Sequence, residues 1–243
     1  MKNVVFMTAI STAKKSSAGY EYSIDSWKRW CDSNQCELFV LTKPIVDIDT
    51  MSPIFFRHYC FDLLGDYEYD QICTVDADTI IHPECPNFFE LTCNRFSAVH
   101  NDGDYDWIIR SIENYQFEFP ENFTKPFDIW KYINSGFIVT NRSFKFVHDA
   151  LLDFYWSNAE KVRSVQKKYG VGTDQPLINL ICNELDVDVN ILPYQFNMQD
   201  LLRKNVLNEL QFTKMPGIYH FNAIPEGKSN DWLIKTYKHF YGI

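Results

Sequence analysis

The stretch QICTVDADTIIHP, residues 71–83, places two aspartates one residue apart directly after a short apolar run. The run has the length and the β-branched content of a buried strand. Because side chains alternate along an extended chain, Asp76 and Asp78 point to the same side. Two carboxylates so close repel each other and raise one pKa unless a cation lies between them. Oxygen ligands of this kind suit Mg²⁺ or Mn²⁺, which keep coordination positions open for water and substrate phosphates.

The aspartate pair alone does not decide between two interpretations. Strand ends in open α/β sheets are where ligands bind, in the crevice beyond the carboxyl edge of the sheet. Two solvated aspartates in the turn after a strand would give the same pattern. The rest of the chain therefore has to discriminate between them.

Apolar runs like the first one recur along the chain. They are VVFM at 4–7, ELFVL at 37–41, QICTV at 71–75 and FIVT at 137–140, and longer segments with helical spacing separate them. This alternation predicts βαβ units, hence a mostly parallel twisted sheet flanked by helices. A chain of 243 residues can bury the core of one such domain, and no repeat or linker divides it. We expect a single α/β domain over residues 1–243.

Two helices have clear start signals. Ser52 and Pro53 open SPIFFRHYCFDLL at 52–64 as N-cap and first-turn proline. Its predicted apolar face consists of Phe55, Phe56, Tyr59, Leu63 and Leu64. Thr173 or Asp174, before Pro176, opens DQPLINLICNEL at 174–185. Its predicted buried stripe consists of Leu177, Leu180 and Ile181.

Residues 101–132 contain nine aromatic side chains without a clear period. We expect an irregular excursion there, which could serve as a lid and as the acceptor region of an enzyme. A packed loop without a binding role fits the same composition.

Composition excludes several classes of function. A net charge of -9 leaves no basic stripe for nucleic acid. No apolar stretch reaches the roughly 18 to 20 residues that span a bilayer, and the N-terminus has no export signal, so we expect no transmembrane segment and a cytoplasmic location. The seven cysteines have neither C-x-x-C nor zinc-finger spacing, which predicts reduced core residues.

One phosphate chemistry that uses an aspartate pair fits poorly. Aspartate-nucleophile phosphatases of the haloacid-dehalogenase type have D-x-D-x-[TV] with an acidic pair downstream. In DADTI the fifth position is Ile80, and the sequence GDYEYD at 65–70 precedes the aspartate pair instead of following it. The order of motifs therefore counts against this class.

The second chemistry, transfer of a sugar from a nucleotide-diphosphate sugar, fits the order of motifs better than the phosphatase chemistry does. ICTVDADTIIHP at 72–83 resembles the metal-binding segment of GT-A glycosyltransferases, most closely the glycogenin and galactosyltransferase-like family 8. Matching segments follow in order over roughly residues 3–232: FFRHYCFDLL with Arg57, INSGFIVTNRS at 133–143, GTDQPLINLI at 172–181, ILPYQFN at 191–197 and IYHFNAIPEGKSNDW at 218–232. The resemblance implies a GT-A fold and a nucleotide-diphosphate sugar, in particular a UDP-sugar, as donor.

The resemblance implies that Asp76, Asp78 and His220 hold Mn²⁺ or Mg²⁺ at the donor diphosphate. A divalent cation there acts as a Lewis acid toward the departing phosphate. Lys228 would contact the diphosphate, with segment 222–243 closing over it. EGKSNDW departs from the family's G-x-x-K-P-W spacing, and an ordinary exposed lysine fits as well.

Further roles carry over from the resemblance. Asp174 and Gln175 would face the reacting side of the donor sugar as catalytic residues, although Asp174 also suits an N-cap. Arg57 would pair with the metal-site carboxylates or the sugar, and a purely structural ion pair is the alternative. The other donor-binding residues implied are Thr8, Ala9, Tyr20 (or Tyr22), Ala77, Asn134, Ser135 and Gly136.

Retention at the anomeric carbon follows from the resemblance alone. The working mechanism is same-face attack assisted by the leaving phosphate, because no carboxylate is clearly placed as nucleophile. An inverting enzyme would need a base, for which Asp106 or Asp128 could serve. A binding module without turnover is the remaining alternative. The acceptor is expected to be a carbohydrate or glycoconjugate of unknown identity.

Overall fold

A computed structural model describes residues 2–11, 18–101, 103–199, 201, 215–222, 224 and 227–242. The central sheet has the strand order β2-β1-β3-β6-β5-β7. Its strands are β1 (Asn3–Thr8), β2 (Cys36–Leu41), β3 (Gln71–Asp76), β5 (Ser97–His100), β6 (Ile133–Thr140) and β7 (Asn190–Ile191). A small second sheet pairs β4 (Thr79–Ile81) with β8 (Ile218–His220).

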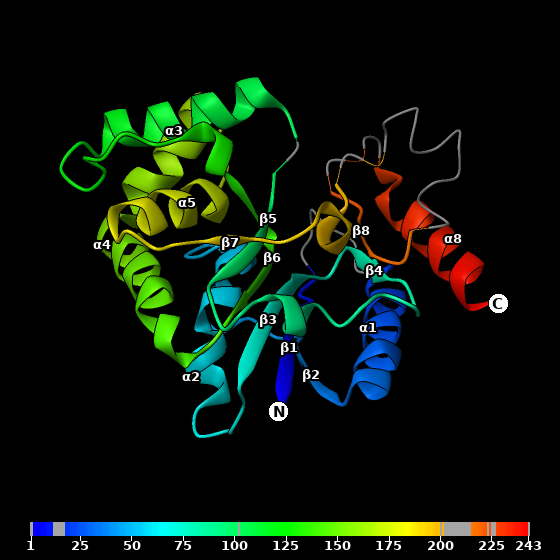
Figure 1. The fold of residues 1–243 in the computed structure, drawn as a ribbon. Coiled ribbons are helices and arrows are strands. Elements are labelled where there is room, and N and C mark those ends of the chain that lie inside the picture. Colours follow the sequence, from blue (N-terminus) through cyan, green and yellow to red (C-terminus); the bar gives the residue numbers. More distant parts are fainter. Residues whose placement is uncertain are drawn as a thin grey trace.

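The α-helices are α1 (Tyr20–Asn34), α2 (Cys60–Leu64), α3 (Tyr105–Glu118), α4 (Lys145–Tyr169), α5 (Asp174–Glu184) and α8 (Ser229–Tyr241). Short 3-10 helices are η1 (Pro53–Tyr59), η2 (Phe88–Leu91), η3 (Ile129–Lys131), η4 (Arg142–Phe144) and η5 (Tyr194–Asn197). In Figure 1, α3, α4 and α5 lie to one side of the central sheet, and α1 and α8 lie to the other.

The sheet confirms the predicted mostly parallel α/β class. β1 pairs in parallel with β2 and β3, and β5 pairs in parallel with β7. All four predicted strands form. The strand that contains FIVT, β6, differs in direction, because it runs antiparallel to β3 and β5. All eight residues of β6 are buried, and a continuous apolar run of this kind carries no information on strand direction.

Two large apolar clusters hold these layers together. The helices α4 and α5 contribute Leu151 and Leu177 to the cluster that also contains Ile138 of β6. On the other side, Trp30 of α1 stacks on Phe88, with ring centroids 4.8 Å apart and planes 6° from parallel. Burying side chains of this size stabilises the fold by about 1.5 to 3 kcal/mol each, before the entropy of ordering them.

The two helices with clear start signals form differently from each other. Helix α5 confirms the prediction, since its whole predicted stripe is buried. Residues 52–64 instead begin as η1, only the last five are α-helical, and the Ser52 side chain makes no capping bond. Three residues per turn shift the apolar face. Leu63 is consequently 46% exposed and Phe61 is buried.

The prediction of an irregular excursion at 101–132 was wrong for its first half, because α3 occupies Tyr105–Glu118. The residues that follow are irregular apart from the short helix η3. The carboxylate of Asp104 caps α3 by accepting hydrogen bonds from two backbone N–H groups. The buried residues Ile108, Ser111, Ile112 and Tyr115 have the spacing of one helical face. That stripe includes a serine and only one aromatic residue, so the density of aromatic side chains obscured it.

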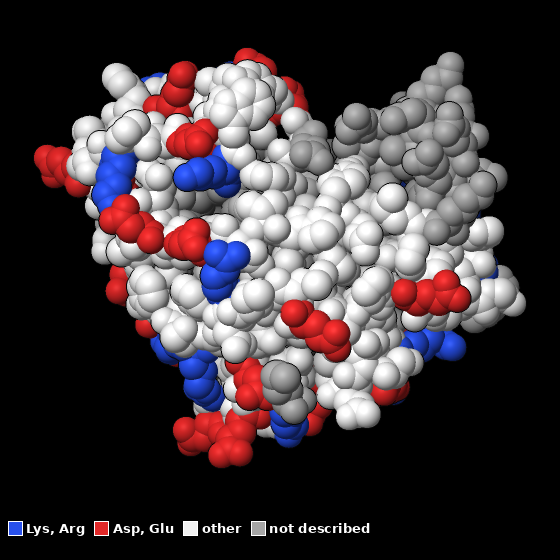
Figure 2. Space-filling view, viewed as in Figure 1, with Lys and Arg blue, Asp and Glu red and all other residues white. Residues whose placement is uncertain are grey.

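Two predictions from composition can be checked on the described residues. All seven cysteines are unpaired, and six of them are buried while Cys93 is exposed. No helix in the described ranges has the length and hydropathy needed to cross a membrane. The face shown in Figure 2 carries acidic and basic side chains interspersed, without a basic stripe.

Candidate active site

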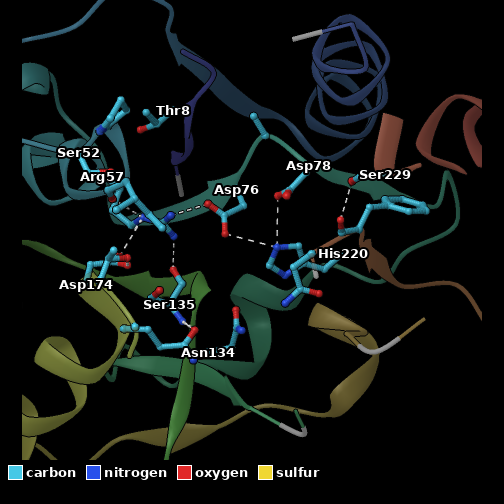
Figure 3. Close-up of a pocket in the computed structure, with 18 of the residues that line it drawn as sticks. Thr8, Ser52, Arg57, Asp76, Asp78, Asn134, Ser135, Asp174, His220 and Ser229 are labelled. Carbon is cyan, nitrogen blue, oxygen red and sulfur yellow. Dashed lines mark hydrogen bonds and ion pairs between the residues drawn. The ribbon is translucent and has the colours of Figure 1, made fainter. Parts of the chain in front are cut away.

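Three titratable side chains converge where the two sheets meet. Asp76 is the last residue of β3, and Asp78 lies in the turn that leads into β4. β8 pairs with β4 so that His220 lies opposite Thr79. This pairing brings a histidine from the C-terminal part of the chain to the aspartate pair, as Figure 3 shows.

The geometry of these three residues fits a divalent cation. Nε2 of His220 lies 3.4 Å from Oδ2 of Asp76 and 3.3 Å from Oδ1 of Asp78. One ligand atom from each residue can be chosen so that all three lie within 4.8 Å of one another. Adjacent ligands of an octahedral Mg²⁺ lie about 3 Å apart, so one ion could bind all three. Oxygen ligands combined with an imidazole suit Mn²⁺ equally.

A second layer of side chains orients the imidazole. Asn197 donates through Nδ2 to Oδ1 of Asn134 at 2.9 Å, so its own Oδ1 is the atom that accepts from Nδ1 of His220, also at 2.9 Å. With Nδ1 of His220 donating its proton to Asn197, the lone pair of Nε2 is left for the cation. The amide of Asn197 therefore sets the tautomer that a metal ligand needs.

Gly136 leaves the space that the three ligands occupy. A Cβ atom at this position would lie 2.5 Å from Oδ2 of Asp76 and 2.5 Å from Cε1 of His220. No side chain larger than hydrogen fits at those distances. The backbone N–H of Gly136 also donates to Oδ1 of Asn134 at 2.8 Å. Gly136 therefore lies directly behind the three side chains that could hold a cation, and its predicted contact with the donor stays a prediction.

Arg57 provides the positive charge behind these carboxylates. Its buried guanidinium lies 2.5 Å from Oδ1 of Asp76 through Nη2 and donates to the backbone oxygen of Ser135 through Nη1. Burial disfavours the charged form of Asp76, but Arg57 and His220 outweigh it and lower its pKa to about 2. The Asp76 carboxylate is therefore ionised and ready to bind a cation at any neutral pH.

The pKa of His220 is shifted in the opposite direction to that of Asp76. Burial alone would lower its pKa, but the hydrogen bonds with Asp76 and Asp78 raise the pKa of His220 to about 9. Without a metal, the imidazole is protonated at neutral pH and neutralises part of the charge of the aspartates. A cation that binds there takes the place of this proton.

Asp174 and Gln175, which were predicted as the catalytic pair, are the first two residues of α5 and lie beside Arg57 and Ser135. The Asp174 side chain is fully buried, and the N-cap of the helix is the preceding residue, Thr173. Its Oδ2 lies 3.4 Å from Nε of Arg57 and 3.4 Å from Nε2 of His58. Gln175 accepts a hydrogen bond from the backbone N–H of Ser135 at 3.1 Å. Arg57 thus links Asp76 to Asp174, and the N-cap alternative for Asp174 was wrong.

His58 was not predicted to take part in this site. It is buried and joins Asp174 to His148, with the two Nδ1 atoms of the histidines 3.1 Å apart. Burial lowers the pKa of both histidines, so both are neutral. The sequence signal was its position directly after Arg57, but only the fold shows that it faces Asp174.

A cavity of about 560 Å³ connects these groups. The predicted residues that line it are Thr8, Tyr20, Arg57, Asp76, Ala77, Asp78, Asn134, Ser135, Asp174, Gln175 and His220. Ala9 does not line it, because it is buried beside β2, where its N–H donates to the oxygen of Leu41. Lys228 lies just before Ser229, which does line it. A contact between Lys228 and a diphosphate stays a prediction.

Several lining residues were not among the predicted site residues, although some of them lie in segments that the sequence analysis had noted. Ser52, Pro53 and Ile54 come from the start of η1, and Trp107 comes from α3. Asn222 and Ile224 come from the segment after β8, so part of the predicted C-terminal closing segment does border the cavity.

Comparison with solved structures identifies the fold of the chain, whereas comparison with known sequences finds no match. No protein-family model matches the sequence, and no curated protein sequence does either. A glycosyltransferase involved in glycosylation of the major capsid of PBCV-1 superimposes with a TM-score of 0.60 at 8% identity, over 96% of this chain and 98% of that one. The galactosyltransferase LgtC, solved with donor and acceptor sugar analogs, gives 0.57 at 12% identity, over 99% and 97%.

Mouse xyloside xylosyltransferase 1 is a third similar structure. Its TM-score is 0.50 at 13% identity, over 92% of this chain and 98% of that one. The chain therefore has the GT-A fold that was predicted.

Proposed function

We propose that this protein is a metal-dependent glycosyltransferase that moves a sugar from a nucleotide-diphosphate sugar, in particular a UDP-sugar, to an acceptor. The observation that carries the proposal is the cluster of Asp76, Asp78 and His220 at the strand ends of a GT-A fold. These residues would hold Mn²⁺ or Mg²⁺. The bound cation would act as a Lewis acid toward the departing diphosphate.

The other residues of the cavity have roles that follow from their contacts. Arg57 keeps Asp76 ionised and holds Asp174 in place through its Nε atom. Asp174 and Gln175 would bind the sugar on the side opposite the metal site. Thr8 and Tyr20, at the end of β1 and the start of α1, would lie along the nucleotide.

Retention is the stereochemical outcome that we propose. The two bases named for an inverting reaction do not line the cavity: Asp106 pairs with Arg110 at 2.7 Å, and Asp128 caps η3. Asp104 lines a neighbouring cavity, but its Oδ1 caps α3. Among the described residues that line the two cavities, the carboxylates are Asp76, Asp78, Asp104 and Asp174. Asp76 and Asp78 belong to the proposed metal site, Asp174 lies beside Arg57, and Asp104 caps α3, so none is placed as an acceptor base. This favours same-face attack assisted by the leaving phosphate.

Two alternatives have less support. An aspartate-nucleophile phosphatase needs a lysine beside its nucleophile, and no lysine is among the described residues that line the cavity. A binding module without turnover would have the same fold and the same metal site, so only an activity measurement separates it from an enzyme. A cytoplasmic location stays a prediction.

Thermal unfolding in the presence of nucleotides tests the proposal first. We would measure the Tm with UDP, GDP, CDP and ADP, each with and without Mn²⁺, for the wild type and for Asp78→Ala. A ligand at about 100 times its Kd adds roughly 2.7 kcal/mol to the free energy of unfolding.

We expect one nucleotide, UDP, to stabilise the wild type only when Mn²⁺ is present, and Asp78→Ala to lose this effect. Release of UDP from UDP-sugars would then separate an enzyme from a binding module. If no nucleotide raises the Tm with Mn²⁺, the proposal is wrong.

A further inference from the structure

A second cavity of about 590 Å³ lies beside the first and shares part of its wall. Trp107, Asn134, Gln175 and Asn222 line both cavities. A molecule in the second cavity would therefore contact Gln175, which we place at the donor sugar. This is the position that an acceptor substrate needs. Four of the residues that line the cavity belong to segment 101–132, which was predicted as a possible acceptor region.

The lining of this cavity consists mainly of side-chain amides. Five of the eight described residues that line it are asparagine or glutamine: Asn101, Asn134, Gln175, Gln199 and Asn222. Such a concentration is costly to bury unless the amides bond to each other or to a ligand. The hydrogen bonds of each amide show whether it is bonded to another amide or is left for a ligand.

Most of these amides hold one another in fixed orientations. Oδ1 of Asn101 accepts from Nδ2 of Asn134 at 3.0 Å and from Nε2 of Gln175 at 3.3 Å. Asn134 also donates to Oε1 of Gln199 at 2.9 Å, and Gln199 donates to the backbone oxygen of His100 at 3.1 Å. A network of this kind is arranged before the ligand arrives, so binding costs little reorganisation.

Two amide groups of the lining, one on Asn222 and one on Asn101, remain for a ligand. Oδ1 of Asn222 is buried and accepts no hydrogen bond from the part of the chain that the structure describes. Both contacts of Asn101 use its oxygen, so Nδ2 is the group that it can offer to a ligand. One acceptor and one donor, both uncharged, match hydroxyl groups, which donate and accept at the same atom.

The charge of the lining is the selective feature. None of the described lining residues is lysine or arginine, and the single carboxylate, Asp104, already caps α3. An anionic ligand would lose its hydration beside Asp104 without gaining a cation from the lining residues that the structure describes. The indole ring of Trp107 adds an aromatic surface, which suits the C–H face of a sugar ring.

We infer that the second cavity binds an uncharged sugar unit as the acceptor and discriminates against acceptors that carry a carboxylate or a phosphate at that unit. This inference rests on the proposed function, because it assigns the acceptor of the same reaction. The sugar hydroxyl that attacks the donor would lie next to Gln175, at the wall that both cavities share.

Matched acceptors test the inference. With Mn²⁺ and UDP-glucose or UDP-galactose, we would measure UDP release alone and with the methyl glycosides of glucose and galactose. The anionic partners are the methyl glycosides of glucuronic and galacturonic acid, which differ only by a carboxylate. We expect the neutral glycosides to stimulate UDP release and the acids to have at least about a tenfold lower kcat/KM, because their charge is desolvated without a partner.

Variants of Asn101 connect the preference to this cavity. Asn101→Ala removes the Nδ2 donor and also the oxygen that holds Asn134 and Gln175. It should therefore raise the KM for neutral glycosides by at least about threefold to tenfold, the effect of losing one hydrogen bond. Asn101→Asp keeps the oxygen that Asn134 and Gln175 contact but replaces the donor, and it should impair transfer as well. Asn114→Ala is the matched control, since Asn114 bonds to the backbone of Arg110 within α3 and lines neither cavity.

The outcomes separate this inference from the proposed function. If UDP is released by hydrolysis but no neutral glycoside stimulates it, or the acids stimulate it more, the inference is overturned and a protein, lipid or anionic acceptor replaces it. The same holds if Asn101→Ala leaves the KM unchanged. If UDP with Mn²⁺ neither binds nor is released from any UDP-sugar, the proposed function itself fails.

Discussion

Replacing Gly136 by alanine should disable the metal site with the smallest possible change in the side chain. The added Cβ atom would lie 2.5 Å from Oδ2 of Asp76 and from Cε1 of His220, where real Cβ contacts stay above 3.0 Å. The two ligands must therefore move apart by about half an ångström or more. Metal–ligand distances tolerate only about 0.2 Å, so the three ligands can no longer bind one ion together.

The size of this effect can be worked out as a shift in Tm. At a UDP concentration of about 100 times the wild-type Kd with saturating Mn²⁺, the ligand adds roughly 2.7 kcal/mol. For a chain of 243 residues, that corresponds to about 5 to 11 °C. If Gly136→Ala weakens binding about 100-fold, the same UDP concentration adds only about 0.4 kcal/mol, or roughly 1 to 2 °C.

Differential scanning fluorimetry with and without UDP and Mn²⁺ measures both numbers. Overpacking should also lower the Tm of the ligand-free variant, at a cost of about 1 to 3 kcal/mol. Gly170→Ala controls for this loss of stability: Gly170 has φ of +62°, and a Cβ there would contact nothing within 4 Å. The control should unfold earlier yet keep the full ligand-induced shift. A Gly136→Ala protein with the wild-type shift would refute the reasoning.

Three further predictions follow from the charges at the site. Asp78→Asn should reduce metal-dependent UDP release at least about 100-fold, since a Lewis acid at the diphosphate contributes several kcal/mol, while circular dichroism stays unchanged. In metal-free protein the pKa of His220 is raised to about 9, so protonated His220 stabilises the fold fully below pH 6.5 and this stabilisation is lost as the pH rises toward 9. The Tm should therefore decrease from pH 6.5 to 8, and His220→Gln should reduce the slope of Tm against pH. Burial lowers the pKa of His148, so the free energy of unfolding should decrease as the pH drops below 6.5. The Tm of His148→Gln should depend less on pH between 6.5 and 5 than that of the wild type, and the same pH dependence in both proteins would contradict the prediction.

Much of the fold was predictable because it depends on local patterns. The four apolar runs became strands, and the helix at Asp174 began at the predicted residue with its predicted buried stripe. The errors have local causes as well. Residues 101–132 contain a helix whose stripe includes Ser111, and the helix after Ser52 begins with 3-10 geometry, which shifts its apolar face.

The strands of the α/β sheet and the aspartate pair at the end of one of them could be read from local sequence, and the histidine that joins the pair followed from resemblance to a family. Four features became visible only in the folded chain: Gly136 lies behind Asp76 and His220, Asn197 orients His220, His58 reaches Asp174, and amides line a second cavity. A local pattern depends on neighbours a few residues apart. These contacts join residues that are 23 to 116 positions apart in the chain, such as Asn197 with His220 and His58 with Asp174, and they exist because separate strands and helices end at the same edge of the sheet.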